Sequence, residues 1–252
     1  MGIYVGADKI KSLYAGENKI VKAYIGDFLV FSAVPSRLPA GYTEVEYIKG
    51  SSNGNSNYRP YLSIPNTTGA VRLKFAFSAG DQAQMNRTYC NFVLGKNRST
   101  GTAANALRWY GLGASNGKIH YDYGVNAYQI DSIAAVAGTK YDIDIRESEK
   151  KLFVNGSVSI LSGTSSWVSK EFTVFYPTNV NNSYHSITAY TLYPVTLYYL
   201  QLLDANGNLL RDLVPCRNSA GKVGMYDLIT DTFFENVNTS SKCEPFIAGP
   251  AV

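Results

Sequence analysis

The residues whose spacing comes closest to a catalytic arrangement are the three acids Asp142, Asp144 and Glu147. Residues two apart on a strand lie on one face about 6.6 Å apart, and retaining glycosidases use carboxyl groups about 5–5.5 Å apart. The chemistry would be glycoside hydrolysis. However, apolar residues alternate with the acids from 141 to 145, which is typical of a strand with one buried and one solvated face. We therefore expect the acids to lie on the solvated face without a catalytic role, and hydrolysis is the less favoured alternative.

Other catalytic signatures are missing from the sequence. The chain has two His residues, His120 and His185, and neither a His-Glu-x-x-His nor a Gly-x-Ser-x-Gly motif. The glycine cluster at 111–118 fits neither Gly-rich phosphate-binding spacing, so we interpret it as a loop between strands. Residues 204–208 begin like a calcium loop but lack the distal Glu of an EF-hand, and they predict a hairpin turn. The sequence predicts no enzyme and no catalytic residue.

Aromatic residues gather between positions 105 and 123, beside amide, acidic and basic residues. Carbohydrates are bound by such mixtures, because aromatic faces pack against sugar C–H groups while polar groups fix the hydroxyls. Core packing and protein–protein contact are the alternatives, since Tyr and Trp also fill cores and interfaces. Trp167 is left open between an exposed anchor and a residue packed beneath a loop. The candidate carbohydrate-binding residues are Asn105, Arg108, Trp109, Tyr110, Tyr121, Asp122 and Tyr123.

The composition favours an all-β protein. Hydrophobic residues make up 45% of the 252 residues and charged residues only 17%, which allows a sizeable core. The 20 Tyr, 11 Phe and 22 Gly are typical of strands and turns. A net charge of +4 with scattered Lys and Arg argues against nucleic-acid binding. We also expect no signal peptide and no membrane insertion, because no apolar run of sufficient length is present.

The three cysteines, Cys90, Cys216 and Cys243, are widely spaced. Their spacing matches neither a complete disulfide framework nor a zinc-binding pattern. Reduced and partly buried thiols are therefore expected, because free Cys is among the most buried residue types. A bridge between Cys216 and Cys243 stays open as an alternative, and no metal ligand is predicted.

The first 32 residues contain a ten-residue repeat, at residues 3–10, 13–20 and 23–30. Each unit has Tyr second, Gly fourth and an aliphatic residue eighth, which predicts a short strand, a turn and a second short strand. Such a segment buries too little apolar surface to fold well alone. We therefore expect residues 1–32 to form an attachment or oligomerisation module, with a hairpin packed on the main domain as the alternative. Its attachment residues are Tyr4, Tyr14 and Tyr24.

A linker and one main domain follow the repeats. Residues 33–40 contain two Pro without periodicity, which predicts a linker. From 41 to 252 the sequence has short apolar segments separated by Gly, Asn and Ser clusters, as in the alternating segment 71–77 and around the Asn-Gly turn at 155–156. Residues 131–136 are a weak helical candidate that also suits a strand. Many short strands at this spacing predict a β-sandwich or barrel.

Two parts of the main domain carry a family resemblance. Residues 38–48 have the sequence Leu-Pro-Ala-Gly-Tyr-Thr-Glu-Val-Glu-Tyr-Ile, and residues 210–216 have the sequence Leu-Arg-Asp-Leu-Val-Pro-Cys. Gly-Met-Tyr-Asp-Leu at 224–228 and Phe-Phe-Glu-Asn at 233–236 follow. These segments resemble the opening and closing strands of laminin-G-like, concanavalin-type jelly-roll domains of phage and gut-bacterial proteins. The resemblance implies an antiparallel jelly-roll β-sandwich over residues 41–252.

The ten-residue units are similar to short Tyr-x-Gly repeats of tail-associated proteins encoded by phages of Gram-positive hosts. Together, the resemblances imply a non-enzymatic virion protein, made in the bacterial host cytoplasm and exposed on the particle. Its lectin-like domain would recognise a host-surface carbohydrate, and its other partners would be virion proteins. A homo-oligomer, such as a trimer, is expected because avidity strengthens weak sugar contacts. No cofactor is expected, although the family leaves a rim calcium ion open. A structural or decoration protein without glycan binding is the alternative.

Overall fold

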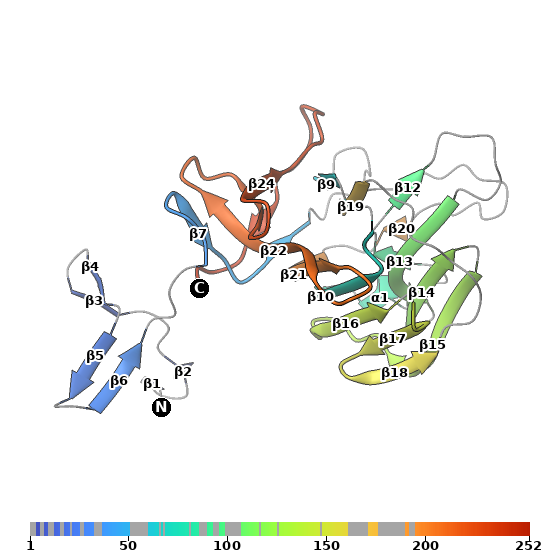
Figure 1. Cartoon of the computed structure of the whole chain (residues 1–252), viewed down its shortest axis with the longest axis horizontal. Coiled ribbons are helices and arrows are strands. Elements are labelled where there is room, and N and C mark those ends of the chain that lie inside the picture. The colour runs from blue at the N-terminus through green and yellow to red at the C-terminus, as the bar shows by residue number, and fades with distance from the viewer. Residues whose placement is uncertain are drawn as a thin grey trace.

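The computed structural model shows a chain built almost entirely of antiparallel β-strands (Figure 1). Among the described residues the one helix is α1 (Gln82–Met85), which the sequence analysis did not predict, and no helix there is long and apolar enough to span a membrane. The predicted all-β class is thereby confirmed. The structure describes residues 4–5, 8–9, 13–15, 18–20, 22–25, 28–32, 37–50, 60–65, 67, 69–80, 82–85, 90–92, 96–98, 107–115, 117–124, 126–146, 148–160, 171–175, 190–191 and 195–252.

The largest sheet has eleven strands. They are β7 (Tyr42–Glu44), β8 (Ile48–Lys49), β10 (Arg72–Ala79), β16 (Tyr141–Arg146), β17 (Lys151–Val154), β18 (Ser157–Ile160), β21 (Val195–Leu203), β22 (Leu209–Asn218), β23 (Val223–Asp227), β24 (Thr232–Glu235) and β25 (Ile247–Ala248). Their order is β18-β17-β16-β10-β21-β22-β23-β24, while β7 pairs with β22 and β8 pairs with both β21 and β25. Strands that are distant in the sequence, such as β10 and β21, are therefore neighbours.

A second sheet has six strands. They are β11 (Cys90–Phe92), β12 (Lys96–Arg98), β13 (Leu107–Ser115), β14 (Lys118–Gly124), β15 (Asn126–Ala134) and β20 (Tyr190–Thr191). The order is β15-β14-β13-β11-β20, with β12 on β13, and β11 and β20 run parallel. The weak helical candidate at 131–136 is a strand as far as Ala134. A separate antiparallel pair joins β9 (Leu62–Pro65) to β19 (Glu171–Val174).

One hydrophobic cluster joins these three groups of strands. Phe75 and Phe77 of β10 are fully buried, as are Ile119 of β14 and Ile64 of β9. Burial of one face of each sheet against the others removes apolar surface from water, which is the main favourable term in folding. The main body is therefore sandwich-like, with its core between sheets.

Local sequence patterns predicted several of these strands and turns correctly. In β10 the alternating residues Leu73, Phe75 and Phe77 are at most 2% exposed. The turn between β17 and β18 has positive φ angles of 48° at Asn155 and 82° at Gly156, as a two-residue hairpin turn requires. The predicted Asn-Gly turn is confirmed. The predicted alternation holds from Arg72 to Phe75, but Ala76, on the expected solvated face, is 0% exposed next to the register shift between Ala76 and Phe77.

The turn between β21 and β22 also forms as predicted. Gly207 has a φ of 84°, and the backbone N of Asp204 donates to the carbonyl of Asn208 at 3.0 Å. The Asp204 carboxylate accepts hydrogen bonds from the backbone N of Asn206 and of Asn208, each at 2.8 Å. Such local bonds stabilise the turn. Residues 204–208 therefore form a hairpin turn closed by its own Asp.

Each N-terminal repeat forms one antiparallel hairpin, shown in blue in Figure 1. The hairpins are β1 (Tyr4–Val5) with β2 (Asp8–Lys9), β3 (Leu13–Ala15) with β4 (Asn18–Ile20), and β5 (Lys22–Ile25) with β6 (Phe28–Ser32). The repeated Tyr has an equivalent register in each hairpin, with Tyr4 opposite Lys9, Tyr14 opposite Lys19 and Tyr24 opposite Leu29. Their role in attachment stays a prediction.

The end of the expected linker packs on the main body. Leu38 is 8% exposed and clusters with Val214, Cys216 and Tyr226. Arg37 forms an ion pair with Glu44 of β7. The buried side chain of Leu38 therefore anchors the end of this segment against the large sheet. Residues 33–36 lie outside the described part of the chain.

Candidate functional site

Six of the seven candidate carbohydrate-binding residues lie on two paired strands of the six-stranded sheet. Asn105, the seventh, and Trp167 lie outside the described residues. The expected loop at 111–118 is wrong, because β13 continues to Ser115 and the turn lies at Gly117. The six residues are Arg108, Trp109 and Tyr110 on β13 and Tyr121, Asp122 and Tyr123 on β14.

The buried residue Ile119 identifies the core-facing side of β14. Ile119 is 0% exposed and belongs to the main hydrophobic cluster. Successive positions of a strand alternate between the two faces of a sheet. Tyr121 and Tyr123 therefore occupy positions on the face of Ile119, whereas Asp122 occupies the opposite face. The register sets Tyr110 opposite Tyr123, so Tyr110 also has a core-side position.

The opposite face carries Trp109 and two glycines. Trp109, Gly111 and Gly113 alternate along β13, and the register sets Asp122 opposite Gly111 and His120 opposite Gly113. Glycine has no side chain, so a strand glycine often marks a place where a ligand comes close to the backbone. We refer to the outer positions 109, 111, 113, 120 and 122 as the Trp109 face. The six described candidates are thus divided between two faces.

Two further polar positions adjoin the Trp109 face. Asn91 of β11 lies opposite Gly113, and Gln129 of β15 lies opposite His120. Sequence reasoning missed Asn91, His120 and Gln129, because their proximity depends on the register between separate strands. The one local signal was the matching alternation of Gly111 and Gly113 on one strand with His120 and Asp122 on the next.

The acids of β16 lie where the sequence predicted. Asp142 is exposed and Asp144 is partly exposed, on the outer face of the large sheet. The apolar residues of the same strand, Tyr141, Ile143 and Ile145, are at most 3% exposed, which confirms that they face the core. Glu147 lies outside the described residues.

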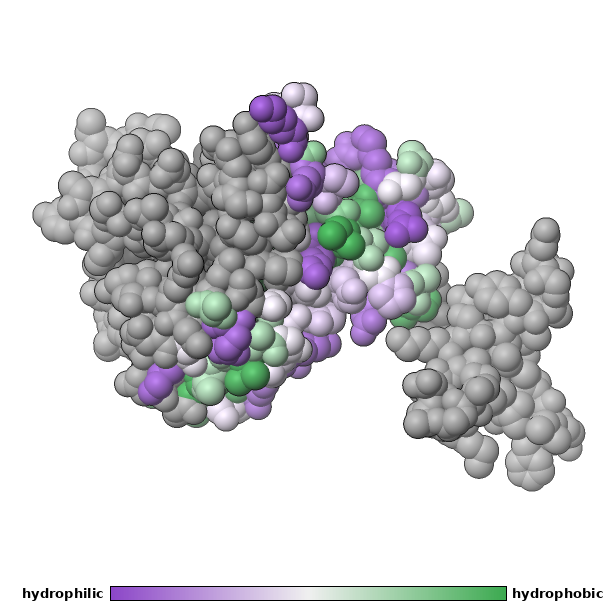
Figure 2. Space-filling model, turned by 180° about the vertical axis from the view of Figure 1, so that it is seen from behind, coloured by the Kyte–Doolittle hydropathy of each residue, from purple (hydrophilic) through white to green (hydrophobic). Residues whose placement is uncertain are grey.

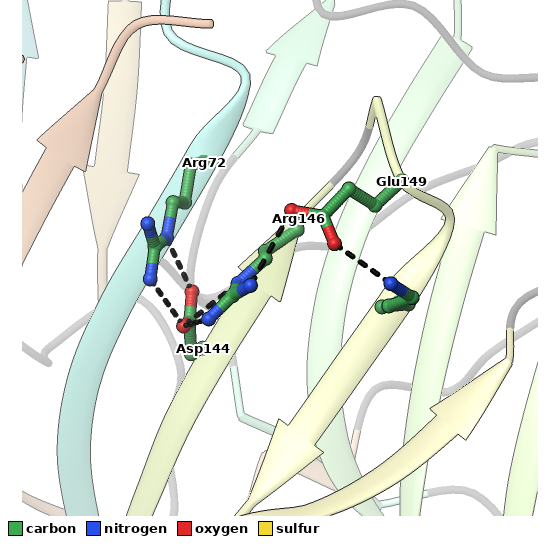
Figure 3. A network of polar contacts seen from close by, with 5 residues as sticks. Arg72, Asp144, Arg146 and Glu149 are labelled. Atoms are coloured by element: carbon green, nitrogen blue, oxygen red, sulfur yellow. Dashed lines mark hydrogen bonds and ion pairs between the residues drawn. The ribbon is translucent and has the colours of Figure 1, made fainter. Parts of the chain in front are cut away.

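Asp144 lies between two guanidinium groups, as Figure 3 shows. Arg72 of β10 donates from Nε at 2.7 Å and from Nη2 at 2.6 Å, one bond to each carboxylate oxygen. Arg146 of β16 donates from Nε at 3.1 Å and from Nη2 at 3.0 Å to Oδ2. Bidentate bonds between a guanidinium and a carboxylate are among the strongest in proteins. The arrangement joins two neighbouring strands across the outer face.

The electrostatics of Asp144 suit a permanently charged group. Partial burial tends to raise its pKa, but the hydrogen bonds from Arg72 and Arg146 outweigh burial and lower the pKa below its ordinary value. A general acid of a glycosidase needs the opposite, a raised pKa. The charged Asp144 carboxylate therefore stabilises the pairing of β16 with β10.

The same network continues outward along β17. Glu149 accepts a hydrogen bond from Nζ of Lys151 at 2.9 Å, which lowers the pKa of its carboxyl, and another from Arg146 at 3.4 Å. The Arg146 guanidinium also lies over the Phe153 ring, 4.4 Å from its centroid. Such a cation–π contact is worth about 0.5–1 kcal/mol at an exposed site. The outer face between β10 and β17 thus carries a row of side-chain ion pairs.

Asp142 has a different partner. The hydroxyl of Tyr199 on β21 donates to Oδ1 of Asp142 at 3.3 Å. Burial, and next the charge of Asp142, raise the pKa of Tyr199 to about 12. The hydroxyl therefore stays protonated at neutral pH and serves as a donor. Asp142 and Asp144 hold separate partners and do not form a shared acid–base pair.

The residues that carry the family resemblance form a buried network. Asp227 is fully buried and accepts hydrogen bonds from the backbone N of Asp212 at 3.0 Å and from Oγ1 of Thr230 at 2.7 Å. Nε of Arg211 lies 3.4 Å from Oδ2 of Asp227, and Nη2 of Arg211 donates to the carbonyl of Pro65 at 3.1 Å. This network holds β22, β23 and β9 together, so these motif residues have a structural task.

Cys216 and Cys243 are not bridged to each other. Cys216 is fully buried and Cys243 is partly exposed, and both are free thiols, so the alternative of a Cys216–Cys243 bridge is wrong. Burial, and next the charge of Glu44, raise the pKa of Cys216 to about 12. Within the described ranges, no three His, Cys, Asp or Glu side chains form a group that could hold a metal ion.

Comparison with models of known protein families finds no match, and comparison with curated proteins finds no relative.

Proposed function

We propose that this chain is a non-enzymatic phage virion protein, tail-associated or fibre-like, whose jelly-roll sandwich binds a host-surface carbohydrate at the Trp109 face. The register of β13 and β14 carries the proposal, because it sets the positions of Trp109 and Asp122 on one outer face beside two glycines. An aromatic ring with nearby polar groups is the combination that sugar recognition requires.

The residue types around the Trp109 face suit a sugar ring. Indole provides a flat apolar surface for sugar C–H groups, and the carboxylate of an Asp accepts hydrogen bonds from hydroxyls. His120, Asn91 and Gln129 occupy neighbouring outer positions and add donors and acceptors. The glycine positions 111 and 113 add no side chains between them, which suits a close approach of a ligand to the backbone. A short segment of a surface glycan fits this chemistry better than an apolar ligand.

The architecture and the repeats support the virion setting. Two largely antiparallel sheets share one core, as a jelly-roll sandwich requires, and the segments at both ends of the main domain resemble laminin-G-like domains. The three Tyr-containing hairpins supply a repeated attachment unit before this domain. If they anchor the chain to a particle, simultaneous replacement of Tyr4, Tyr14 and Tyr24 by Ala lowers its incorporation into particles while the main domain stays folded.

The described acids favour binding over hydrolysis. Asp144 is held by two Arg side chains with a lowered pKa, and Asp142 accepts a bond from Tyr199. A lowered pKa at Asp144 is the opposite of what a general acid needs. The Asp204 carboxylate is occupied by its own turn, so we propose no calcium role for that loop.

A glycan array with matched Asp variants tests the proposal. The unaltered chain is expected to bind one class of bacterial surface glycan, and both Trp109→Ala and Asp122→Asn are expected to lose at least tenfold in affinity. Asp142→Asn, on the other sheet, is the control and keeps binding. Circular dichroism verifies that each variant is folded. Equal binding by Asp122→Asn and Asp142→Asn would contradict the Trp109 face as the site.

A structural or decoration protein without glycan binding is the second candidate. The repeated hairpins favour it, because they supply contacts that need no sugar. It predicts no array signal, together with incorporation into particles that depends on Tyr4, Tyr14 and Tyr24. Sugar release that is lost in Asp144→Asn would overturn both candidates in favour of a hydrolase.

A further inference from the structure

The strand β18 forms one edge of the large sheet. Among the described strands it pairs with β17 alone. Its two aliphatic residues protrude, with Val158 53% exposed and Ile160 72% exposed. Figure 2 shows hydrophobic and hydrophilic residues interspersed over the described part of one face of the molecule. Soluble proteins usually protect an edge with Lys, Pro or a bulge, and the Ser-Val-Ser-Ile sequence of β18 has no such protection.

The turn before β18 determines which backbone groups face outward. Val154 and Ser157 are opposite each other and close the two-residue turn. The closing pair of such a hairpin exchanges two hydrogen bonds, and bonded and non-bonded pairs then alternate. Ser157 and Ser159 therefore direct their N–H and C=O groups toward β17. Val158 and Ile160 direct theirs away from the sheet, where a further strand can pair.

We infer that the β18 edges of two copies of this chain pair antiparallel about a two-fold axis and form a dimer with one continuous sheet. In this register Ser159 lies opposite Ser159 of the second copy, and Val158 lies opposite Ile160 of the second copy. The outward groups of Val158 and Ile160 then form four hydrogen bonds. An isologous contact of this kind needs only one self-complementary surface, and β18 has that property.

The side chains beside the edge are also self-complementary. Phe153 lies opposite Val158 and Lys151 opposite Ile160 within one chain. Across the two-fold axis, each row contains Lys151 and Ile160 of one copy followed by Val158 and Phe153 of the other. Cross-strand aliphatic and aromatic pairs of this kind stabilise a sheet. Apolar residues separate the basic groups of the two copies, so like charges do not oppose pairing.

The predicted dimer is weak and depends on concentration. A strand of four residues buries less than the roughly 1,200 Å² of a standard interface. The inference does not rest on glycan binding, since the Trp109 face belongs to the other sheet. If both are correct, the dimer presents two glycan sites and gains affinity through avidity.

Sedimentation velocity of the full chain tests the inference over roughly 1–300 µM, the range of a weak interface. The mass per particle is expected to double with concentration, and both Ile160→Lys and Val158→Lys are expected to abolish the doubling. Ile229→Lys is the control, because Ile229 is 48% exposed in the turn after β23. A constant mass for the unaltered chain, or equal effects of Ile160→Lys and Ile229→Lys, would overturn the inference.

Cysteine cross-linking tests the register. In the proposed dimer Ser159 faces its own copy in a non-hydrogen-bonded pair, which brings Cα atoms within the roughly 4.4–6.8 Å of a disulfide. With oxidised glutathione as the oxidant, Ser159→Cys is expected to give more covalent dimer on a non-reducing gel than the unaltered chain. Ser157→Cys is expected to give no more than the unaltered chain, because Ser157 has no matching Ser157 opposite it. Cross-linking by Ser157→Cys alone would overturn the two-fold register.

Discussion

The two ends of the eleven-stranded sheet are held in different ways. Near β24, Asp227 and Arg211 form a buried pair, and a Cβ atom at Gly224 would lie 2.1 Å from the carbonyl oxygen of Phe234. At β18, Ile160 protrudes and the nearest ion pairs are partly exposed. The closing strands are therefore held by buried internal contacts, whereas no described strand covers the outer edge of β18. The motifs that carry the family resemblance lie at the end near β24.

Removal of the buried carboxylate should have the largest effect on stability. Asp227→Ala removes the carboxylate next to the Arg211 guanidinium and leaves the backbone N of Asp212 without its acceptor. Breaking a buried pair on one side costs about 3–5 kcal/mol. Urea denaturation measures the free energy of unfolding, with the exposed Asp142→Ala as the control. A loss below about 1 kcal/mol would show that this end of the sheet is not held by Asp227.

The substitution Gly224→Ala should cause the next largest loss in the free energy of unfolding, because Gly224 is closely packed. The added Cβ of Gly224→Ala meets the backbone of Phe234 and lies 2.9 Å from two atoms of the Phe233 ring. Overpacking of this kind costs about 2–3 kcal/mol, because β24 must shift. Gly221→Ala is the control, since it meets no atom within 4 Å but has a φ of 79°. Gly221→Ala should cost about 1 kcal/mol, from backbone strain alone. An equal loss of stability in Gly221→Ala and Gly224→Ala would rule out the packing explanation.

The ion pairs of Asp144 with Arg72 and Arg146 should contribute less to stability than Asp227 or Gly224, and their contribution should depend on pH. Asp144→Asn is expected to cost about 1–2 kcal/mol at pH 7, because Arg72 and Arg146 are 26% and 30% exposed and solvent weakens their bonds. The folded-state pKa of Asp144 lies below its unfolded value. Its stabilisation is therefore complete above the unfolded pKa of about 3.9 and is lost as pH falls through the lower folded pKa.

The pH dependence separates charge from packing. The difference in unfolding free energy between the unaltered chain and Asp144→Asn should be constant from pH 5 to 8, on the order of the loss at pH 7, and shrink below about pH 4. Chemical denaturation at a series of pH values measures it. A difference that grows on acidification would contradict the lowered pKa.

The exposed pair between Lys222 and Glu235 should have the smallest effect. Their closest atoms are 2.9 Å apart, but the side chains are 60% and 44% exposed. Pairs of this kind contribute about 0–0.5 kcal/mol, so Lys222→Ala should leave the thermal unfolding midpoint nearly unchanged. A loss comparable with that of Asp144→Asn would mean that position in the sheet, not burial, determines the strength of these pairs.

Local patterns could be predicted from the sequence, whereas pairing could not. The alternation around Ile143 and the Asn155-Gly156 turn depend on neighbouring residues, and both formed as expected. The helix α1 was missed, because four residues carry no helical period. The Arg211–Asp227 pair was missed because its acid and base lie on different strands.

The candidate site was predicted only as a region of the sequence. The aromatic cluster indicated the right strands, but it joined residues such as Trp109 and Tyr110 that the register divides between two faces. Only the burial of Ile119 together with the pairing of β13 and β14 distinguishes the faces. Those facts depend on distant packing, which a single sequence does not reveal.

Tryptophan fluorescence can show whether a glycan binds at the Trp109 face. The chain has two Trp residues, so Trp167→Phe leaves Trp109 as the sole indole reporter. Titration of this variant with a glycan that binds on the array should shift its emission in a saturable way, with the same affinity as the unaltered chain, and added Asp122→Asn should abolish the shift. An emission that stays unchanged while the variant still binds the glycan would contradict carbohydrate binding at the Trp109 face.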